Sequence, residues 1–177
     1  LLANHRWIFS EKVAGTNIRI HFDGEKVTFL GRNNNSHIPP HLLERLEMLF
    51  KTEEVAKYVY PGCILCGEGF GERIEEPLGS QYNPDHADFI LFDVIAMDGK
   101  YCDRSIVEKI AQNFNIQAVP LVFSGTLEEA VAYIKEKPAS KIAENIAMEG
   151  IVGTPEGDFL TGRGERIVVK LRLDDFT

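Results

Sequence analysis

The sequence predicts an α+β fold in which antiparallel sheets are flanked by helices. Alternating apolar and polar residues, which indicate strands, occur towards both ends of the chain, and stretches with helical periodicity interrupt them. An Asp23-Gly24 pair between two alternating stretches is a hairpin signal, and hairpins join antiparallel strands. Separate runs of strands and helices are typical of the α+β class.

The strands are predicted from alternation and from turn residues at their ends. In the second of them, Ile18, Ile20 and Phe22 share one face. Asp98-Gly99 closes a later and longer one. The predicted strands cover residues 7–9, 16–22, 26–30, 63–68, 88–97, 150–154 and 167–173.

Three helices are predicted between these strands. The first covers residues 41–58, because Leu42, Leu46, Leu49 and Phe50 form one apolar stripe. The second begins after Asp103, which can cap it, and carries apolar residues at helical spacing. The third opens with a capping box at Thr126 and Glu129 and stops near Pro138.

Length and composition fit one globular domain that covers residues 1–177. No run of about eighteen apolar residues is present, so no transmembrane helix and no membrane partner are predicted. The three cysteines are expected to be reduced thiols of a cytoplasmic protein, and the lone pair Cys63 and Cys66 lacks the second ligand pair of a zinc site.

The net charge of −8 argues against a surface that coats nucleic acid in general. Any affinity for a polynucleotide must come from local lysines and arginines, or from an accessory nucleic-acid-binding module outside this chain. The oligomeric state is left open, with a monomer as the working expectation.

Six short motifs follow one another along the chain, each at or near a predicted strand. Any one of them is weak, since an isolated Lys-x-x-Gly is usually a surface turn. Their order and spacing make them informative. They are Glu11-Lys12-Val13-Ala14-Gly15-Thr16-Asn17, Gly31-Arg32-Asn33, Gly67-Glu68-Gly69-Phe70-Gly71, Phe92-Asp93-Val94, Glu149-Gly150-Ile151-Val152 and Val169-Lys170-Leu171-Arg172.

This ordered set resembles the signature motifs of the covalent nucleotidyltransferases, which include ATP-dependent RNA and DNA ligases and mRNA capping enzymes. The stretches WIFSEKVAGTNIRI, GRNNNSHIP, GEGFGERI, FILFDV and VKLRLDDF are most similar to small bacterial and phage RNA ligases. The likeness spans nearly the whole chain. It implies a nucleotidyltransferase fold in which an ATP cleft lies between two antiparallel sheets.

The resemblance implies that Lys12 is the catalytic nucleophile. Its amine would attack the α-phosphorus of ATP and expel pyrophosphate, leaving a lysyl–AMP phosphoramide. The amine must be neutral to attack, whereas a free lysine has a pKa of about 10.4. A nearby cation such as Lys170, or a metal, would lower that pKa. ATP and Mg²⁺ or Mn²⁺ are the implied cofactors.

The resemblance also assigns roles in nucleotide binding. Glu11 would accept a hydrogen bond from the adenine amino group, which favours ATP over GTP, and Phe92 would stack on the adenine face. Asn17 and Arg32 would contact phosphate or sugar, and Glu68 would bind the ribose hydroxyls. Taken alone, Phe92 is better explained as a core residue, whereas Glu68 between glycines is harder to explain by structure.

The last two motifs would serve the phosphates and the metal. Glu149 would bind the catalytic metal, because a hard carboxylate suits magnesium. Lys170 and Arg172 would hold the α-phosphate and the pyrophosphate. Their alternation with Val169 and Leu171 would also be found in a strand that simply exposes one face to solvent. Arg172 replaces a more usual lysine and keeps the charge in a planar group.

Ala14 is the main departure from the family pattern, whose common form is Lys-x-Asp-Gly, with histidine at the acidic position in some RNA ligases. Alanine can neither ligate nor hydrogen bond through its side chain. Its methyl group fits the turn, so folding and nucleotide binding are expected to survive. Sealing of RNA is expected to be slow, and Ala14→Asp is predicted to speed sealing more than adenylylation.

The sequence therefore predicts an RNA ligase that acts on RNA ends or nicked RNA duplexes, in the setting of RNA repair. One alternative is a DNA ligase or capping-type enzyme that uses the same lysine. Another is a nucleotide-binding domain that Ala14 has impaired in catalysis.

Overall fold

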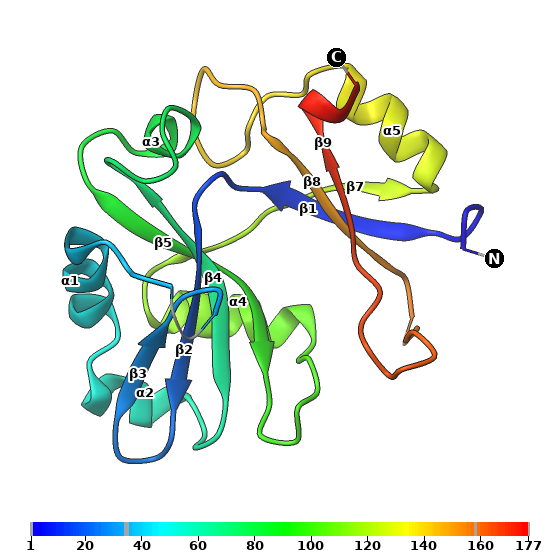
Figure 1. Cartoon of the computed structure of the whole chain (residues 1–177). Helices are drawn as coiled ribbons and strands as arrows, with labels where there is room; N and C mark the ends of the chain where they lie inside the picture. The colour runs from blue at the N-terminus through cyan, green and yellow to red at the C-terminus, as the bar shows by residue number, and fades with distance from the viewer. Residues whose placement is uncertain (1, 34–35, 158, 177) are drawn as a thin grey trace. The chain divides into compact units, whose positions relative to one another are not determined.

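The computed structural model describes residues 2–33, 36–157 and 159–176 (Figure 1). The chain divides into two compact units. Unit 1 comprises Leu1–Val13 and Val119–Thr177, and unit 2 comprises Ala14–Ala118. The boundary falls directly after Lys12 and Val13, so the first motif contributes residues to both units. Each unit contains one sheet, which confirms the predicted α+β class with two sheets.

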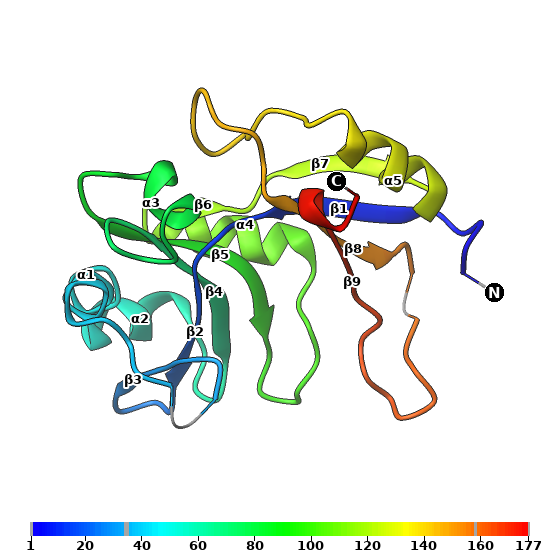
Figure 2. The ribbon, with the colours of Figure 1, turned by 45° about the horizontal axis from the view of Figure 1, so that its top comes forward.

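The sheet of unit 1 has the strand order β7-β1-β8-β9, and every neighbouring pair is antiparallel. Helix α5 (Leu127–Lys135) covers one face, as Figure 2 shows, where its Ala130 and Ile134 pack with Trp7 and Phe9. The strands are β1 (Trp7–Lys12), β7 (Leu121–Gly125), β8 (Gly150–Pro155) and β9 (Val169–Arg172), and the short helix η1 (Leu173–Phe176) follows them.

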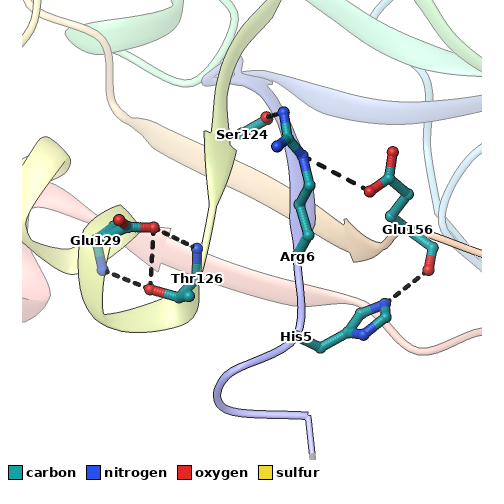
Figure 3. Close-up of polar contacts among 6 residues, drawn as sticks. All are labelled: His5, Arg6, Ser124, Thr126, Glu129 and Glu156. Carbon is teal, nitrogen blue, oxygen red and sulfur yellow. Dashed lines mark hydrogen bonds and ion pairs between the residues drawn. The ribbon is translucent and has the colours of Figure 1, made fainter.

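The start of β1 is tied to its neighbours by side chains (Figure 3). Arg6 donates to the Ser124 hydroxyl of β7 over 2.7 Å and lies 3.6 Å from the Glu156 carboxylate, just after β8. The predicted capping box is confirmed, because the Thr126 hydroxyl accepts from the Glu129 amide and the Glu129 carboxylate accepts from the Thr126 amide. These contacts fix the edge of the sheet and the start of α5.

The sheet of unit 2 has the order β3-β2-β4-β5-β6 and is antiparallel except for the parallel pair β5–β6. That parallel pair differs from the predicted all-antiparallel sheet. It arises because α4 (Arg104–Asn113) returns the chain along β5 before the two-residue strand β6. The strands are β2 (Thr16–Phe22), β3 (Val27–Leu30), β4 (Ile64–Gly71), β5 (Ala87–Ile95) and β6 (Gln117–Ala118).

One face of this sheet carries the core of unit 2. Ile18, Ile20 and Phe22 of β2 lie in it, as their alternation predicts. Helices α1 (Pro40–Leu49), α2 (Thr52–Tyr58) and α4 cover this face, and the short helix α3 (Leu78–Tyr82), which the sequence does not predict, follows β4. The opposite face carries Asn17 of β2 and Glu68 of β4, together with the buried apolar residues Phe70 and Ile90.

The predicted helix over residues 41–58 is wrong in one respect, because it is two helices. They are α1 (Pro40–Leu49) and α2 (Thr52–Tyr58). Phe50 leaves the helical conformation and packs between Phe89 and Phe114, with ring centroids 5.5 and 4.9 Å away. A continuous helix would instead turn acidic residues towards the core. Within the described ranges, no helix is long and apolar enough to span a bilayer.

Candidate functional site

Lys12 is the last residue of β1, and its ammonium group is held by a carboxylate. It pairs across the sheet with Gly150, the first residue of β8, and this places Glu149 beside it. The Lys12 Nζ donates to both Glu149 carboxylate oxygens, over 2.6 and 2.7 Å. Both side chains are about five-sixths buried, at 17% and 16% exposure. The two residues predicted as nucleophile and metal ligand are thus brought into direct contact.

The ion pair defines the resting form of the lysine. A carboxylate at this distance stabilises an ammonium group, and partial burial strengthens the attraction. An ammonium has no lone pair for attack on phosphorus. The amine must therefore lose a proton and leave Glu149 before it can act as a nucleophile.

Lys170 and Arg172 lie on the same face of the sheet as Lys12. Strand register aligns Lys12, Gly150 and Arg172 in one row, and Ser10, Val152 and Lys170 in the next. Both cationic side chains are exposed, while Val169 and Leu171 between them pack against the core of unit 1. Three cations and one carboxylate therefore share this face, an arrangement that attracts a polyanion such as a nucleoside triphosphate.

Glu11 points the opposite way, into unit 1. Its side chain is 1% exposed. One carboxylate oxygen accepts from the Ser140 hydroxyl over 2.6 Å, and the other accepts from the Lys141 amide over 2.7 Å. The Ser140 oxygen in turn accepts from the amides of Ile142 and Ala143, so its proton is directed to Glu11. Burial raises the pKa of Glu11, although these hydrogen bonds act in the opposite direction.

In this structure Glu11 binds the Ser140 hydroxyl and the Lys141 amide, and its predicted contact with adenine stays a prediction. Both of its oxygens already have donors, and the carboxylate fastens the segment that leads from α5 towards Glu149. The sequence analysis missed Ser140 as its partner. The alternation of Trp7, Phe9 and Glu11 on one face was the available signal that Glu11 points inward.

Replacement of Glu11 by alanine is expected to lower the free energy of unfolding by about 1–3 kcal/mol, because two buried donors lose their acceptor. Urea denaturation of Glu11→Ala, Ser140→Ala and the double variant measures the coupling between the two side chains. If the role of Glu11 is structural alone, the ATP-over-GTP preference is retained in Glu11→Ala. Loss of that preference would support the predicted adenine contact.

The nucleotide-binding candidates of unit 2 gather on the sheet face opposite its core. Asn17 of β2 and Glu68 of β4 are directly paired across the sheet. On β5 the register shifts, so that Cys66 pairs with Asp93 and Gly67 with Leu91, and Phe92 has no residue opposite it. Such a bulge re-aims a side chain. Phe92 is half-buried and lies outside the core, whereas Phe89 is in it.

The glycines beside Glu68 have a packing reason that the sequence analysis did not foresee. A Cβ on Gly67 would lie 2.2 Å from the Phe89 ring, and one on Gly69 would lie 2.4 Å from the Leu42 side chain. Both glycines therefore make room for core residues beneath the sheet. They are explained without a ligand, so they no longer support a binding role for Glu68. That role rests on its pairing with Asn17.

Arg32 follows β3 and is exposed in the turn that Gly31 begins. Arg19 of β2 holds this turn, because its guanidinium donates to the Gly31 carbonyl from Nε and Nη2, over 3.3 and 3.2 Å. No sequence pattern indicated that Arg19 would make this contact. Within unit 2, Arg19 therefore fixes the turn that carries Arg32.

Ala14 is only 3% exposed. The Cα of Gly79 in α3 packs against its carbonyl, since a Cβ on Gly79 would lie 3.0 Å from that oxygen. A larger side chain at this position would therefore be buried in this structure. That Ala14→Asp speeds RNA sealing more than adenylylation stays a prediction, and the substitution is now also expected to lower stability.

Ala14→Asp is expected to lower the free energy of unfolding by about 1–3 kcal/mol, because a carboxylate would be buried without a designed partner. Ala14→Ser, which is smaller and uncharged, is the control and should cost less. Thermal unfolding of both variants measures this, and sealing rates are then compared where both are folded. An Ala14→Asp variant as stable as wild type would show that the position opens to solvent.

A divalent metal would find few protein ligands at Lys12. Across residues 2–33, 36–157 and 159–176, no three His, Cys, Asp or Glu side chains gather to hold an ion. Glu149 is one carboxylate beside the cationic row. A single carboxylate fits Mg²⁺, which commonly keeps several waters and takes further ligands from substrate phosphates. The donor set is therefore compatible with a metal that arrives together with a nucleotide.

Comparison with known proteins identifies the family and the fold. The family described as RNA ligase matches residues 5–172. A Naegleria gruberi RNA ligase mutant with ATP and Mn is similar, at TM-score 0.73 and 18% identity, covering 99% of this chain and 51% of that chain. The Naegleria gruberi RNA ligase with PPi has TM-score 0.72 and 19% identity, covering 98% of this chain and 51% of that one.

A further Naegleria gruberi RNA ligase mutant, with AMP and Mn, has TM-score 0.73 and 18% identity over 99% of this chain and 52% of its own. This chain thus spans about half the length of these solved relatives. Likeness at such identities establishes the shared fold, and the family match covers nearly all of the sequence. The chain belongs to the RNA ligase family.

Proposed function

We propose that this chain is the nucleotidyltransferase part of an ATP-dependent RNA ligase that works through a lysyl–AMP intermediate. The observation that supports this most is the grouping in unit 1 of Lys12, Glu149 and the cations Lys170 and Arg172 on one sheet face. A nucleophile, an acidic group and cations for phosphate are the components that phosphoryl transfer requires.

The reaction would proceed in three balanced steps. The Lys12 amine forms an N–P bond to the α-phosphorus of ATP, the bond to the pyrophosphate oxygen breaks, and the amine loses a proton. An oxygen of an RNA 5′-phosphate then bonds to the phosphorus of that AMP, the N–P bond to Lys12 breaks, and the leaving amine takes up a proton. A 3′-hydroxyl finally attacks that 5′-phosphorus, a phosphodiester forms, and AMP leaves.

The residues of unit 1 would act on the charges in the first step. Lys170 and Arg172 draw the triphosphate to the face that carries Lys12 and offset the charge that develops on it. Glu149 keeps Lys12 at the strand end until a nucleotide arrives. A bound Mg²⁺ or Mn²⁺ would neutralise phosphate charge and give Glu149 another cation to bind. The solved relatives with ATP or AMP and Mn support this choice of cofactors.

Unit 2 would hold the nucleoside. Glu68 and Asn17 would face the ribose and phosphate, Phe92 would stack on the base, and Arg32 would contact phosphate or sugar. The cross-strand pairing of Asn17 with Glu68 supports this assignment for those two residues. The setting we propose is repair of nicked RNA in the cytoplasm, where free thiols such as Cys63, Cys66 and Cys102 are the rule.

A sealing assay tests the proposed function. Nicked duplexes with RNA, DNA or mixed strands at the nick are incubated with the chain, ATP and Mg²⁺ or Mn²⁺. We expect joining only when RNA flanks the nick. Equal joining of DNA nicks would favour the DNA ligase alternative. Bound ATP with neither joining nor an AMP adduct would favour a non-catalytic nucleotide-binding domain.

A further inference from the structure

The chain that leads into β9 is extended with a regular alternation beyond the strand itself. Ile167, Val169 and Leu171 all pack against the core of unit 1. The residues that alternate with them therefore point away from that core. These outward positions, which we call the outward strip, are Arg166, Val168, Lys170 and Arg172.

The outward strip is cationic on a chain whose net charge is −8. Three of its four positions carry arginine or lysine, and none carries an acid. Val168, Lys170 and Arg172 are exposed, Val168 by 45%, and Arg166 is half-buried. Outward side chains two apart on an extended chain are separated by about 6.8 Å. That spacing is comparable to the spacing of successive phosphates along a nucleic-acid strand.

One end of the outward strip, Arg172, lies beside Lys12, and the rest of the strip leads away from it. Arg172 stands in the same cross-strand row as Lys12, and Lys170 stands in the next row. Val168 and Arg166 continue the line beyond the sheet, at the edge where β9 has no further strand beside it. A nucleic-acid strand whose end lies at Lys12 can therefore run along the outward strip.

The distal part of the strip is held in place by the hairpin that carries it. Arg166 forms an antiparallel bridge with Leu160. The Thr161 hydroxyl accepts from the amides of Arg163 and Glu165 and closes the turn between them. Near the hairpin's base, the ring of His5 contacts that of Phe159 at 4.7 Å. Arg166 is thus presented by a structured arm.

We propose that Arg166 and Val168 extend the phosphate-binding face of Lys12, Lys170 and Arg172 into a track for the sugar–phosphate backbone of the RNA strand that receives AMP. The inference rests on the proposed function for the identity of the ligand. Arg166 binds a backbone phosphate beyond the terminal one. Val168 offers an apolar contact to the nucleotide between the cations.

The test measures binding of a short, fluorescently labelled, 5′-phosphorylated single-stranded RNA by the whole chain over a salt series. Each lost phosphate contact lowers the slope of log affinity against log salt by about 0.7 for single strands. Arg166→Ala is expected to weaken binding several-fold and to reduce the slope by that amount. Val168→Lys, which adds a cation to the line, is expected to tighten binding and to steepen the slope.

Arg163→Ala is the matched control, because Arg163 is exposed in the same hairpin but lies at the turn, outside the alternation. Its affinity and slope should equal those of wild type. The inference is overturned if Arg166→Ala binds RNA as wild type does. It is also overturned if Arg163→Ala loses as much RNA affinity as Arg166→Ala. Adenylylation is measured separately. Failure to form lysyl–AMP while RNA binding is intact counts against the proposed function. Formation of lysyl–AMP while the Arg166 variant binds RNA as wild type does counts against the track.

Discussion

Lys12→Ala is expected to abolish self-adenylylation, because it removes the amine that lies at the end of β1 beside Glu149 and the cationic row. The measurement is incubation with ATP labelled in the α-phosphate, followed by denaturing electrophoresis. Loss of a covalent nucleophile removes the step itself and not merely a part of its rate. A labelled alanine variant would show that another residue carries the nucleotide.

Lys12→Arg is the informative control. A guanidinium keeps the positive charge and can pair with the Glu149 carboxylate, yet it stays protonated and cannot attack phosphorus. The arginine variant should therefore fold like wild type and bind ATP, but remain unlabelled. A folded arginine variant that still becomes labelled would contradict a nucleophilic role for Lys12.

Glu149→Ala is expected to lower the adenylylation rate by about 10²–10³, the loss typical of removing one electrostatic partner of a transition state. The resting Lys12 also loses the carboxylate that holds it at 2.6 Å. The rate is measured across a magnesium titration, with circular dichroism as the check on folding. Near wild-type rates at every magnesium concentration would remove Glu149 from the site.

Glu149→Gln separates the charge of this residue from its hydrogen-bonding capacity. The amide oxygen can still accept from Lys12, so the lysine should keep its position. The negative charge that would attract a metal is absent. We expect a loss close to that of Glu149→Ala. A glutamine variant with full activity would mean that positioning alone is the role of Glu149.

Strand patterns along the sequence predicted which face each residue takes, but not which residues lie side by side. Alternation alone separates Lys170 and Arg172 from Val169 and Leu171. The row that joins Arg172 to Lys12 depends on the register of β1 with β8 and of β8 with β9. Register over such sequence distances is decided by packing of the whole sheet, and no local pattern encodes it.

At Glu11 the local pattern and the resemblance gave different expectations, and only the first is tested by the structure, which buries the side chain. Its alternation with Phe9 indicated a buried position, whereas the resemblance indicated a base contact. Ser140, its hydrogen-bond partner, is 129 residues away in sequence. Nothing near Glu11 in the chain predicts that contact. The break between α1 and α2 was visible locally, as a shift in apolar spacing after Phe50.

The central claim, that Lys12 carries AMP, is tested most directly by mapping the adduct on the wild-type chain. After incubation with ATP and Mg²⁺ or Mn²⁺, the chain is digested under conditions that preserve phosphoramides, and its peptides are analysed by mass spectrometry. The account predicts one AMP group, on the peptide that contains Lys12, and its removal when pyrophosphate is added. AMP on a different residue, or no adduct on a chain that demonstrably binds ATP, would contradict it.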